Sequence, residues 1–339
     1  MRARCLRCCC ISRMPSMNRA TDLWPSLPLS EWHDTCETLH LWTQVLGKLR
    51  IAVTPWLNHS WHVPLYLTAR GLSTSPIDVD GRALDVEFDF IDHHLRMRSS
   101  DGGRAELALS PRTVAEFYAR VMSMLADLGF TIAIDRMPNE IADAVPFDQD
   151  NAHAAYDADY ANRFWRALLQ SARVLAQFRT GFLGKCSPVH FFWGSFDLAV
   201  TRFSGRRAPL HPGGLPHLPD AVVREAYSHE VSSAGFWPGG NGFDASFYSY
   251  AYPEPPGYRN ARIEPAAAAF DATLGEFVLP YEAVRGARDP AGELMRFLES
   301  TYVAAADAAH WDRASLECVQ GRPDVPRPVT APPRDEHAP

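Results

Sequence analysis

The positions of apolar residues predict a helix, a set of strands and a second helix, and this order then occurs again. Leu39, Trp42 and Leu46 recur at helical spacing and predict an amphipathic helix over residues 31–47. In residues 83–91 apolar and acidic residues alternate, which is typical of a strand buried on one face. The following strand offers Arg96 and Arg98, so we expect acidic and basic side chains to meet across a hairpin.

The same criteria predict the remaining elements. In the first half they indicate strands over 63–70, 95–99, 104–109 and 130–135, and a helix over 114–128. In the second half they indicate a helix over 157–178, strands over 189–193, 196–203, 222–228, 245–252 and 276–281, and a last helix over 290–309. The loop over 204–220 is longer than ordinary connections, so we expect a lid or a disordered segment there.

This order predicts an α+β protein of two lobes, each an antiparallel sheet flanked by helices. An acidic, proline-containing stretch between the halves is interpreted as the connector. The predicted divisions are a disordered leader (1–23), an N-terminal lobe (24–137), the connector (138–156), a C-terminal lobe (157–318) and a disordered proline-rich tail (319–339).

Two aromatic segments, 58–72 and 189–203, leave open an internal duplication. Trp61 and Trp193 each precede an arginine, Arg70 and Arg202, by nine residues. A duplication would make the segments equivalent strands that face each other across a cleft between the lobes, where ligands commonly bind. Chance similarity between aromatic strands is the alternative.

Charge and composition exclude some classes of partner. The net charge of −7, without a long basic block, argues against nucleic-acid binding. No apolar run is long enough to cross a membrane, so we expect neither a membrane-spanning segment nor a membrane partner. Between residues 24 and 318 the cysteines are few and scattered, which favours a reducing cytoplasm over a disulfide scaffold.

The first candidate site lies at the start of a predicted strand. His59 and His62 are three residues apart on either side of Trp61, a spacing compatible with two metal ligands on a turn. Histidines that pack or cap are the alternative. The predicted first helix also carries His33, Glu37 and His40, which could bind a metal or form a solvated polar face.

The second candidate site is the stretch from Lys185 to Arg202, KCSPVHFFWGSFDLAVTR. His190 lies on a short apolar strand. Asp197 lies among apolar residues, where an unpaired carboxylate is costly to bury. We therefore expect Asp197 to pair with Arg202, Lys185 or Arg70, either as a structural ion pair or in a ligand site.

The third candidate site is AYSHEVSSAGFWPGGNGF. Tyr227, His229 and Glu230 could supply acid/base groups, although His229 and Glu230 would face opposite sides of a strand. The GFWPGGNG segment with Trp237 is interpreted as a flexible loop that could act as a lid. There is no GxGxxG, Walker-type, HExxH or GxSxG motif, which argues against the commonest dinucleotide, NTP, zinc-protease and α/β-hydrolase functions.

Long segments of the chain resemble a bacterial family known only as a domain of unknown function. They are TLHLWTQVLGKLR, NHSWHVPLYLTARGLSTSPI, FDFIDHHL, GKCSPVHFFWGSFDLAVTRFSGR, AYSHEVSSAGFWPGG and FYSYAYPEP. The resemblance extends over about residues 24–317. It implies a bacterial, cytoplasmic protein, but it brings no activity or catalytic residues with it.

These observations leave three functional hypotheses. The first is an enzyme or binding protein for a small polar or anionic molecule held between the lobes, with arginines to capture a carboxylate or phosphate. The others are a metal-assisted hydrolase that uses His, Asp and Glu ligands, and a non-enzymatic oligomeric interaction module. No specific cofactor or metal is predicted. The candidate catalytic residues are His190, Asp197, His229 and Glu230; the candidate ligand-binding residues are His59, Trp61, His62, Arg70, Trp193, Arg202, Tyr227 and Trp237.

Overall fold

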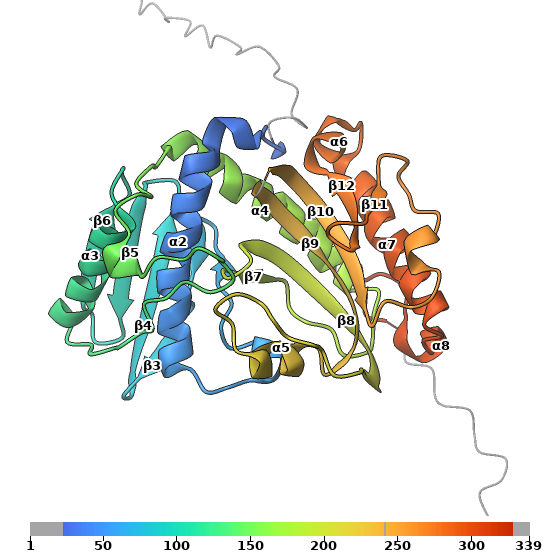
Figure 1. The fold of residues 1–339 in the computed structure, drawn as a ribbon, viewed down its shortest axis with the longest axis horizontal. Coiled ribbons are helices and arrows are strands. Elements are labelled where there is room, and N and C mark those ends of the chain that lie inside the picture. The colour runs from blue at the N-terminus through green and yellow to red at the C-terminus, as the bar shows by residue number, and fades with distance from the viewer. Residues whose placement is uncertain (1–22, 241, 328–339) are drawn as a thin grey trace, which may run out of the picture.

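The computed structural model of the protein describes residues 23–240 and 242–327. It contains two antiparallel six-stranded sheets, each with helices packed against it, so the predicted α+β fold of two lobes is confirmed (Figure 1). The predicted leader, apart from Leu23, and residues 328–339 of the predicted tail lie outside the described residues. In the described part of that tail, Gln320 accepts a hydrogen bond from Gln177 (3.1 Å).

The first sheet is a meander in the N-terminal half. Its strand order is β1-β2-β4-β5-β6, with β3 paired to β4. The strands are β1 (Tyr66–Leu67), β2 (Gly71–Ser73), β3 (Ile77–Val79), β4 (Arg82–Asp89), β5 (His94–Ser99) and β6 (Arg104–Ala108). The continuous strand predicted over 63–70 is wrong, because Thr68 to Gly71 form a turn that separates β1 from β2.

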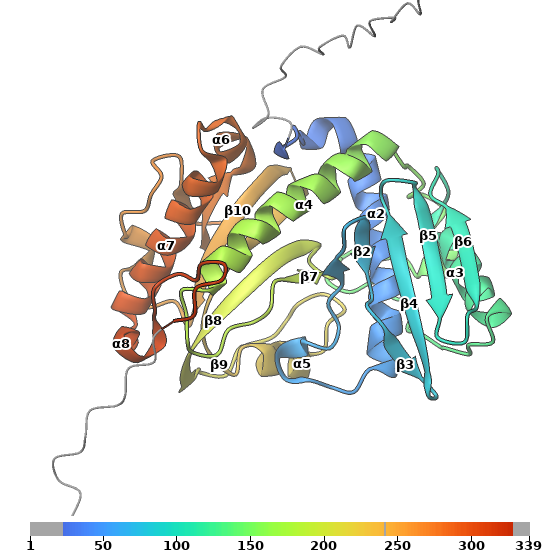
Figure 2. The ribbon, with the colours of Figure 1, turned by 180° about the vertical axis from the view of Figure 1, so that it is seen from behind.

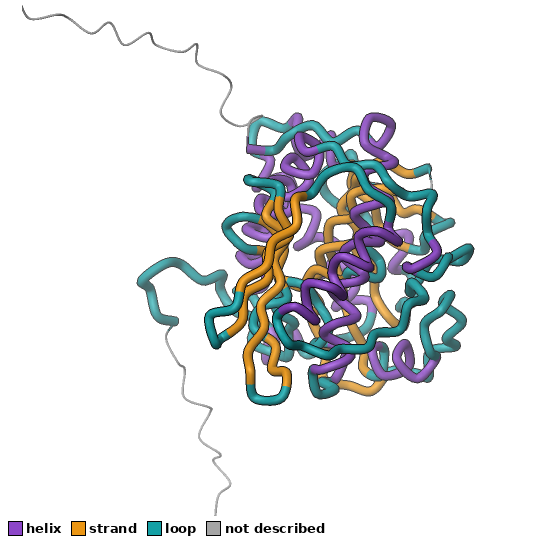
Figure 3. Tube along the Cα trace, turned by 90° about the vertical axis from the view of Figure 1, so that its left-hand side faces the viewer, coloured by secondary structure: helices purple, strands orange, loops and turns teal. Residues whose placement is uncertain are grey.

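Apolar residues of one face of this sheet are buried under two helices, α2 (Leu29–Val53) and α3 (Val114–Asp127). Phe117 of α3 stacks on Trp42 of α2 (ring centroids 4.5 Å apart) and on Phe88 of β4 (6.0 Å). Figure 3, seen from the side of this sheet, shows its strands with a helix packed along one side. Thr113 caps α3 by accepting a hydrogen bond from the backbone N–H of Glu116.

The opposite face of the first sheet carries a network of ion pairs. Asp89 is buried and pairs with both Arg70 and Arg96. Arg98 lies opposite Asp85 and pairs with it (3.4 Å). The expected meeting of acidic and basic side chains across this hairpin is confirmed. Arg70 is part of this network through its pairing with Asp89.

The second sheet belongs to the C-terminal half and has the order β11-β12-β10-β9-β8-β7. Its strands are β7 (His190–Phe192), β8 (Asp197–Arg207), β9 (His229–Gly240), β10 (Phe243–Tyr252), β11 (Ala269–Asp271) and β12 (Glu276–Pro280). The helices α4 (Ala158–Arg179) and α7 (Pro290–Ala308) pack on one face of this sheet (Figure 2). The shorter helices of this half are α5 (Asp220–Ala226), α6 (Tyr281–Gly286) and α8 (Arg313–Leu316).

Three sequence predictions in these regions are wrong. Residues 130–135 form no strand, because Phe130 and Ile132 are buried without a neighbouring strand among the described residues. Residues 222–228 are mainly the helix α5, which Pro219 and Asp220 start. Residues 235–240 are the end of β9 rather than a flexible lid, because they pair with β10 across a hairpin.

Within the described residues, one backbone bridge joins the two sheets. Leu65, just before β1, exchanges two backbone hydrogen bonds with Phe191 of β7 (2.9 and 3.1 Å). Next to this bridge, the indole N–H of Trp193 donates to the carbonyl oxygen of Val63 (2.8 Å). Its ring also occupies the space that a side chain at Gly47 of α2 would fill. The two aromatic segments therefore lie side by side; whether they arose by duplication stays a prediction.

Candidate functional site

Two connected cavities lie on the face of the second sheet that is turned away from α4 and α7. We call the larger one the acidic chamber; it has a volume of about 840 Å³ and lies between α2, residues 140–145 and strands β8, β9, β10 and β12. We call the other one the apolar chamber; it has a volume of about 550 Å³ and lies between the end of α2, residues 133–140, β8 and α5. The loop before α5 contributes Leu215 to both chambers. This loop, over which a lid was predicted, thus forms part of the wall.

Alternate residues of the strands form the floor of the chambers, because successive side chains of a strand point to opposite faces. The floor residues are Asp197, Ala199, Thr201 and Phe203 of β8, Ser233 and Trp237 of β9, Tyr248 and Tyr250 of β10, and Glu276 of β12. The pairing register places Thr201 opposite Ser233, and their hydroxyl groups are 2.9 Å apart. The intervening residues, such as Leu198 and Phe236, are buried in the core on the other side.

Asp197 is the central acidic group of the site. Its side chain accepts hydrogen bonds from the hydroxyls of Ser195 (2.5 Å) and Tyr248. No Lys or Arg of the described chain forms a salt bridge with it, so the expected pairing with Arg202, Lys185 or Arg70 is wrong. Burial raises the pKa of the carboxyl group, and the two hydroxyl donors oppose this change only in part.

A glycine makes the contact between Tyr248 and Asp197 possible. Tyr248 of β10 lies opposite Gly235 of β9, and Asp197 belongs to β8 on the far side of β9. A Cβ atom at Gly235 would overlap both the Tyr248 ring and the backbone oxygen of Leu198. The absence of a side chain therefore lets the tyrosine extend across one whole strand to reach the carboxylate.

A row of partly buried tyrosines continues from this pair. Tyr250 stacks on Tyr248 (ring centroids 6.1 Å apart), and its hydroxyl lies 2.9 Å from that of Tyr227, which follows α5. Burial holds the pKa of Tyr227 and of Tyr248 well above the ordinary value. These hydroxyls therefore stay protonated at neutral pH and act as hydrogen-bonding groups rather than as bases.

Glu140 reaches the site from the connector after α3. Its backbone has a left-handed conformation (φ 63°), and its N–H donates to the carbonyl oxygen of Pro216 (2.9 Å). The neighbouring Asn139 exchanges two hydrogen bonds with the side chain of Gln44 of α2 (2.8 and 3.0 Å). The Glu140 carboxylate occupies the space that a side chain at Gly194 would fill. Contacts to α2 and to the loop before α5 thus fix an otherwise strained residue in place.

The charge of Asp197 affects two other carboxyl groups in the acidic chamber. Burial, with the charge of Asp197 as the second cause, raises the pKa of Glu140 to about 7. Burial and then the charges of Asp197 and Asp271 raise the pKa of Glu276 to about 7 as well. Near neutral pH this group of acids therefore holds protons that exposed carboxylates would have released. Such groups can exchange protons with a ligand or bind a cation in place of those protons.

His40 of α2 helps to fix the turn beside Asp197. Its Nε2 atom lies 2.8 Å from the carbonyl oxygen of Gly194, and its ring stacks on Phe196 (centroids 4.9 Å apart). Burial lowers its pKa to about 4, so the ring is neutral at physiological pH and can donate its single N–H to that carbonyl. In the predicted row of His33, Glu37 and His40, only His40 is turned inward.

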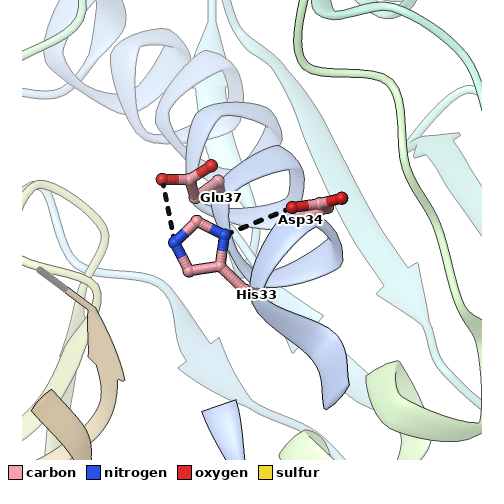
Figure 4. Close-up of side chains that lie close together, drawn as sticks. All are labelled: His33, Asp34 and Glu37. Atoms are coloured by element: carbon pink, nitrogen blue, oxygen red, sulfur yellow. Dashed lines mark hydrogen bonds and ion pairs between the residues drawn. The ribbon is translucent and has the colours of Figure 1, made fainter. Parts of the chain in front are cut away.

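The other members of that row lie at the outer end of the acidic chamber. His33 contacts Glu37 (3.4 Å) and Asp34 (3.2 Å), as Figure 4 shows. These three side chains form the only group of three His, Cys, Asp or Glu ligand atoms close enough to hold a metal within residues 23–240 and 242–327. All three are exposed, as polar residues on a helix surface commonly are.

The apolar chamber has a different lining. Aromatic and aliphatic side chains surround it, including Trp56, Trp61, Phe192, Trp193, Phe203 and Val223. Its one lysine, Lys48, is buried and pairs with Asp135 (3.1 Å), so that positive charge is already neutralised. Trp56 is 57% exposed and Ile51 is 45% exposed at the edge of this chamber.

The profile of a family of unknown function, DUF5996, matches residues 24–318. The chain belongs to this family. The matched region contains every residue that lines the two chambers. No curated protein and no solved structure shows significant similarity to this DUF5996 chain.

Half of the residues predicted from the sequence line the chambers of this DUF5996 protein. Asp197, Tyr227, Trp237, His59, Trp61 and Trp193 do so. His59 is held in one orientation: its Nδ1 lies 3.0 Å from the Ala226 carbonyl oxygen and its Nε2 lies 2.6 Å from Lys185 Nζ. This arrangement suits a neutral ring, in agreement with a pKa lowered by burial.

The other predicted histidines line neither chamber. His62 accepts a hydrogen bond from the backbone N–H of Leu57 (3.2 Å). His190 is buried beside Trp61, and burial lowers its pKa to about 4. The His229 ring contacts that of His59 (centroids 6.0 Å apart). His59, His190 and His229 are therefore connected through aromatic contacts, whereas the ring of His62 contacts Trp56, and the four histidines do not converge on one concavity.

The remaining predicted residues also lie outside the chambers. Arg202 is buried on the other face of the second sheet, 3.5 Å from the ring centroid of Phe178, and donates to its carbonyl oxygen (2.5 Å). Glu230 pairs with Arg206 (2.7 Å). Arg70 pairs with Asp89 on the first sheet. The two arginines thus belong to different lobes and do not meet at one site.

Glu140, Glu276, Tyr248 and Tyr250 line the site but were not among the residues predicted from the sequence. The alternation in FYSYAY does place Tyr248 and Tyr250 on one face of the predicted strand over 245–252, which is a usable signal. Glu276 begins a predicted strand next to Gly275. Glu140 lies in the connector, where the sequence offers no periodicity that would identify it.

Proposed function

We propose that the acidic chamber binds a small, positively charged organic molecule. The observation that carries this proposal is the charge of its lining. Six carboxyl groups and no Lys or Arg line it among the described residues; the six are Glu37, Glu140, Asp143, Asp150, Asp197 and Glu276. Of these, Asp197 is buried without a cationic partner, a state that a bound cation would relieve.

The aromatic residues of the chamber support the same ligand class. Phe196, Tyr227, Trp237 and Tyr248 lie along its walls. Aromatic faces attract organic cations, and several of them around one point favour an ammonium group. An anion would have to approach uncompensated carboxylates, so among small polar or anionic molecules, the class expected from the sequence, we propose a polar molecule that carries a positive charge.

Chemical transformation of the bound molecule is a second candidate, supported by the proton-holding carboxyl groups. Glu140, whose pKa is raised to about 7, is suited to donating and accepting a proton near neutral pH. Mass spectrometry of a candidate amine after incubation with the wild type and with Glu140→Gln tests this function. A change of mass that needs Glu140 supports it, and an unchanged amine in both samples contradicts it for that compound.

The hypothesis of a metal-assisted hydrolase remains a proposal that no specific observation favours. The histidines on which it depended are held by Lys185, by backbone groups or by aromatic packing. The oligomeric interaction module also remains a proposal. Trp193, its suggested contact residue, is buried against α2.

We propose that the protein is bacterial and that it resides in the cytoplasm. Cys36, Cys186 and Cys318 are free thiols, as expected in a reducing compartment. No helix within the described residues is long and apolar enough to cross a membrane.

Thermal unfolding with matched small molecules tests the proposed ligand class. Choline and spermidine serve as cations, D-glucose as a neutral polyol and citrate as an anion. We expect the cations to raise the unfolding temperature of the wild type and to lose this effect in Asp197→Asn. Stabilisation by glucose or citrate alone, or an unchanged cation effect in Asp197→Asn, would contradict the proposal.

A further inference from the structure

The two chambers meet at the carboxyl groups rather than being separate cavities. Six polar residues line both of them: Glu140, Ser195, Asp197, Tyr227, Tyr248 and Tyr250. A molecule bound at Asp197 can therefore contact both spaces. Each chamber alone has the volume of an ordinary small-ligand site, roughly 300–1,000 Å³.

The chambers differ in the kind of chemical group that they accommodate. Apart from the shared residues, the acidic chamber is lined by further acids, including Glu276, Glu37 and Asp150. The apolar chamber is instead lined by aromatic residues such as Phe203 and Trp61. A small ammonium ion would pair with the carboxyl groups where the two chambers meet. It would leave the apolar chamber filled with water, which is unfavourable next to aromatic and aliphatic side chains.

The outer edge of the apolar chamber is also apolar. Ile51 and Trp56 line it and are 45% and 57% exposed, respectively. Lys48, the only lysine that lines this chamber within the described part of the chain, pairs with Asp135, so it offers no free positive charge for an anionic group. An apolar substituent can therefore enter this space without burying an unpaired charge.

We propose that the ligand is a cationic amphiphile, with its ammonium head at Asp197 and Glu140 and its apolar tail in the apolar chamber. This proposal rests on the proposed function, because it adds a tail to the cation already assigned to the site. The tail explains why a carboxyl cluster lies between one space lined by acids and another lined by tryptophans.

A series of alkyltrimethylammonium ions tests the tail directly. Affinities of tetramethyl-, butyltrimethyl- and hexyltrimethylammonium are measured by calorimetry below their micelle concentrations. Each buried methylene is expected to raise the affinity about two- to fourfold. Hexanol and hexyl sulfate share the tail of the longest member, and we expect them to bind at least about tenfold more weakly because they lack the positive head.

Variants at the edge of the apolar chamber identify where the tail lies. Ala52 is an exposed residue of α2 that lines this chamber, so Ala52→Trp should fold normally and fill part of the space. We expect Ala52→Trp to abolish the increase in affinity with alkyl chain length but to leave the affinity for tetramethylammonium unchanged. Trp56→Ala should make this increase in affinity smaller. Leu57→Ala is the matched control, because Leu57 is 48% exposed but lines neither chamber.

The outcomes separate this inference from the function on which it rests. If tetramethylammonium binds in an Asp197-dependent way but longer chains bind no better, the inference is overturned and the proposed function stands. If no ammonium ion of the series binds, the proposed function itself fails. A gain with chain length that persists in Ala52→Trp would place the tail elsewhere and would also overturn the inference.

Discussion

Tyr248 donates its hydroxyl hydrogen to Asp197 across the full width of strand β9. The contact depends on Gly235, whose missing side chain leaves room for the tyrosine ring. One glycine in the middle of the sheet thus connects β10 to the carboxylate on β8.

The first prediction concerns this glycine. Gly235→Ala should destabilise the protein by about 2–4 kcal/mol, because the new methyl group overlaps the Tyr248 ring and the backbone of Leu198. Urea unfolding measures the change. Gly286→Ala is the control: the added methyl meets open space in α6, so its effect should be within about 1 kcal/mol of zero or stabilising. Equal stabilities of the two variants would contradict the proposed role of Gly235.

The second prediction concerns the dependence of stability on pH at Glu140. Its pKa is about 7 in the folded protein and ordinary in the unfolded chain, so the folded state holds the proton more tightly. The resulting stabilisation is complete below about pH 4 and is lost as the pH rises through 7. Glu140→Gln should therefore match the wild type at pH 4 and be more stable by about 2 kcal/mol at pH 8. This value is smaller than the full shift implies, because the side chain is partly exposed.

Urea unfolding at both pH values measures this difference. Glu282→Gln is a suitable control, because the Glu282 side chain is 68% exposed and its substitution should have little effect at either pH. A Glu140→Gln variant that is less stable than the wild type at pH 8 would show that the carboxylate makes favourable contacts rather than costly ones.

The third prediction concerns ligand binding and protons. A cation that binds beside Glu140, Asp197 and Glu276 favours their charged forms, so binding should release protons near neutral pH. The affinity for hexyltrimethylammonium should be roughly tenfold higher at pH 8 than at pH 5.5. Calorimetry in buffers of different ionisation enthalpy counts the protons released. Proton uptake, or tighter binding at pH 5.5, would contradict a cation at these carboxyl groups.

The fourth prediction separates Arg202 from ligand binding. Arg202 lies between the rings of Phe178 and Tyr302 behind the sheet, so Arg202→Ala should cost about 3 kcal/mol of stability. Arg202→Met retains the length of the side chain and should cost less. Whatever protein remains folded should bind the ammonium series as the wild type does. Loss of binding in a well-folded Arg202→Met variant would place Arg202 in the functional site after all.

Most of the fold was predictable because its long elements have clear periodicity. The helices α2, α4 and α7, and strands such as β4, follow from apolar residues at regular spacing. The valines of α5 were assigned to a strand, since a short apolar run does not distinguish strand from helix without its end signals at Pro219 and Asp220. Residues 130–135 have the composition of a strand, but a strand also needs a partner, which a local pattern cannot reveal.

The site was less predictable than the fold. Asp197 could be identified from the sequence, because a carboxylate within an apolar run needs a hydrogen-bonding or ionic partner. The identity of those partners could not be predicted. The bond of Asp197 to Tyr248 depends on the register of three strands and on the space above Gly235. Glu140 enters from a connector held in place by Gln44 of a distant helix, which no spacing along the chain encodes.

The backbone pairing of Leu65 with Phe191 has a consequence for how the chain folds. During synthesis the first sheet leaves the ribosome before α4 and β7 exist, so the backbone groups of Leu65 must wait for a partner made much later. Closing such a long loop is slow compared with forming local hairpins. Until then the early half of the chain exposes an unpaired strand edge, and such edges favour pairing with other chains.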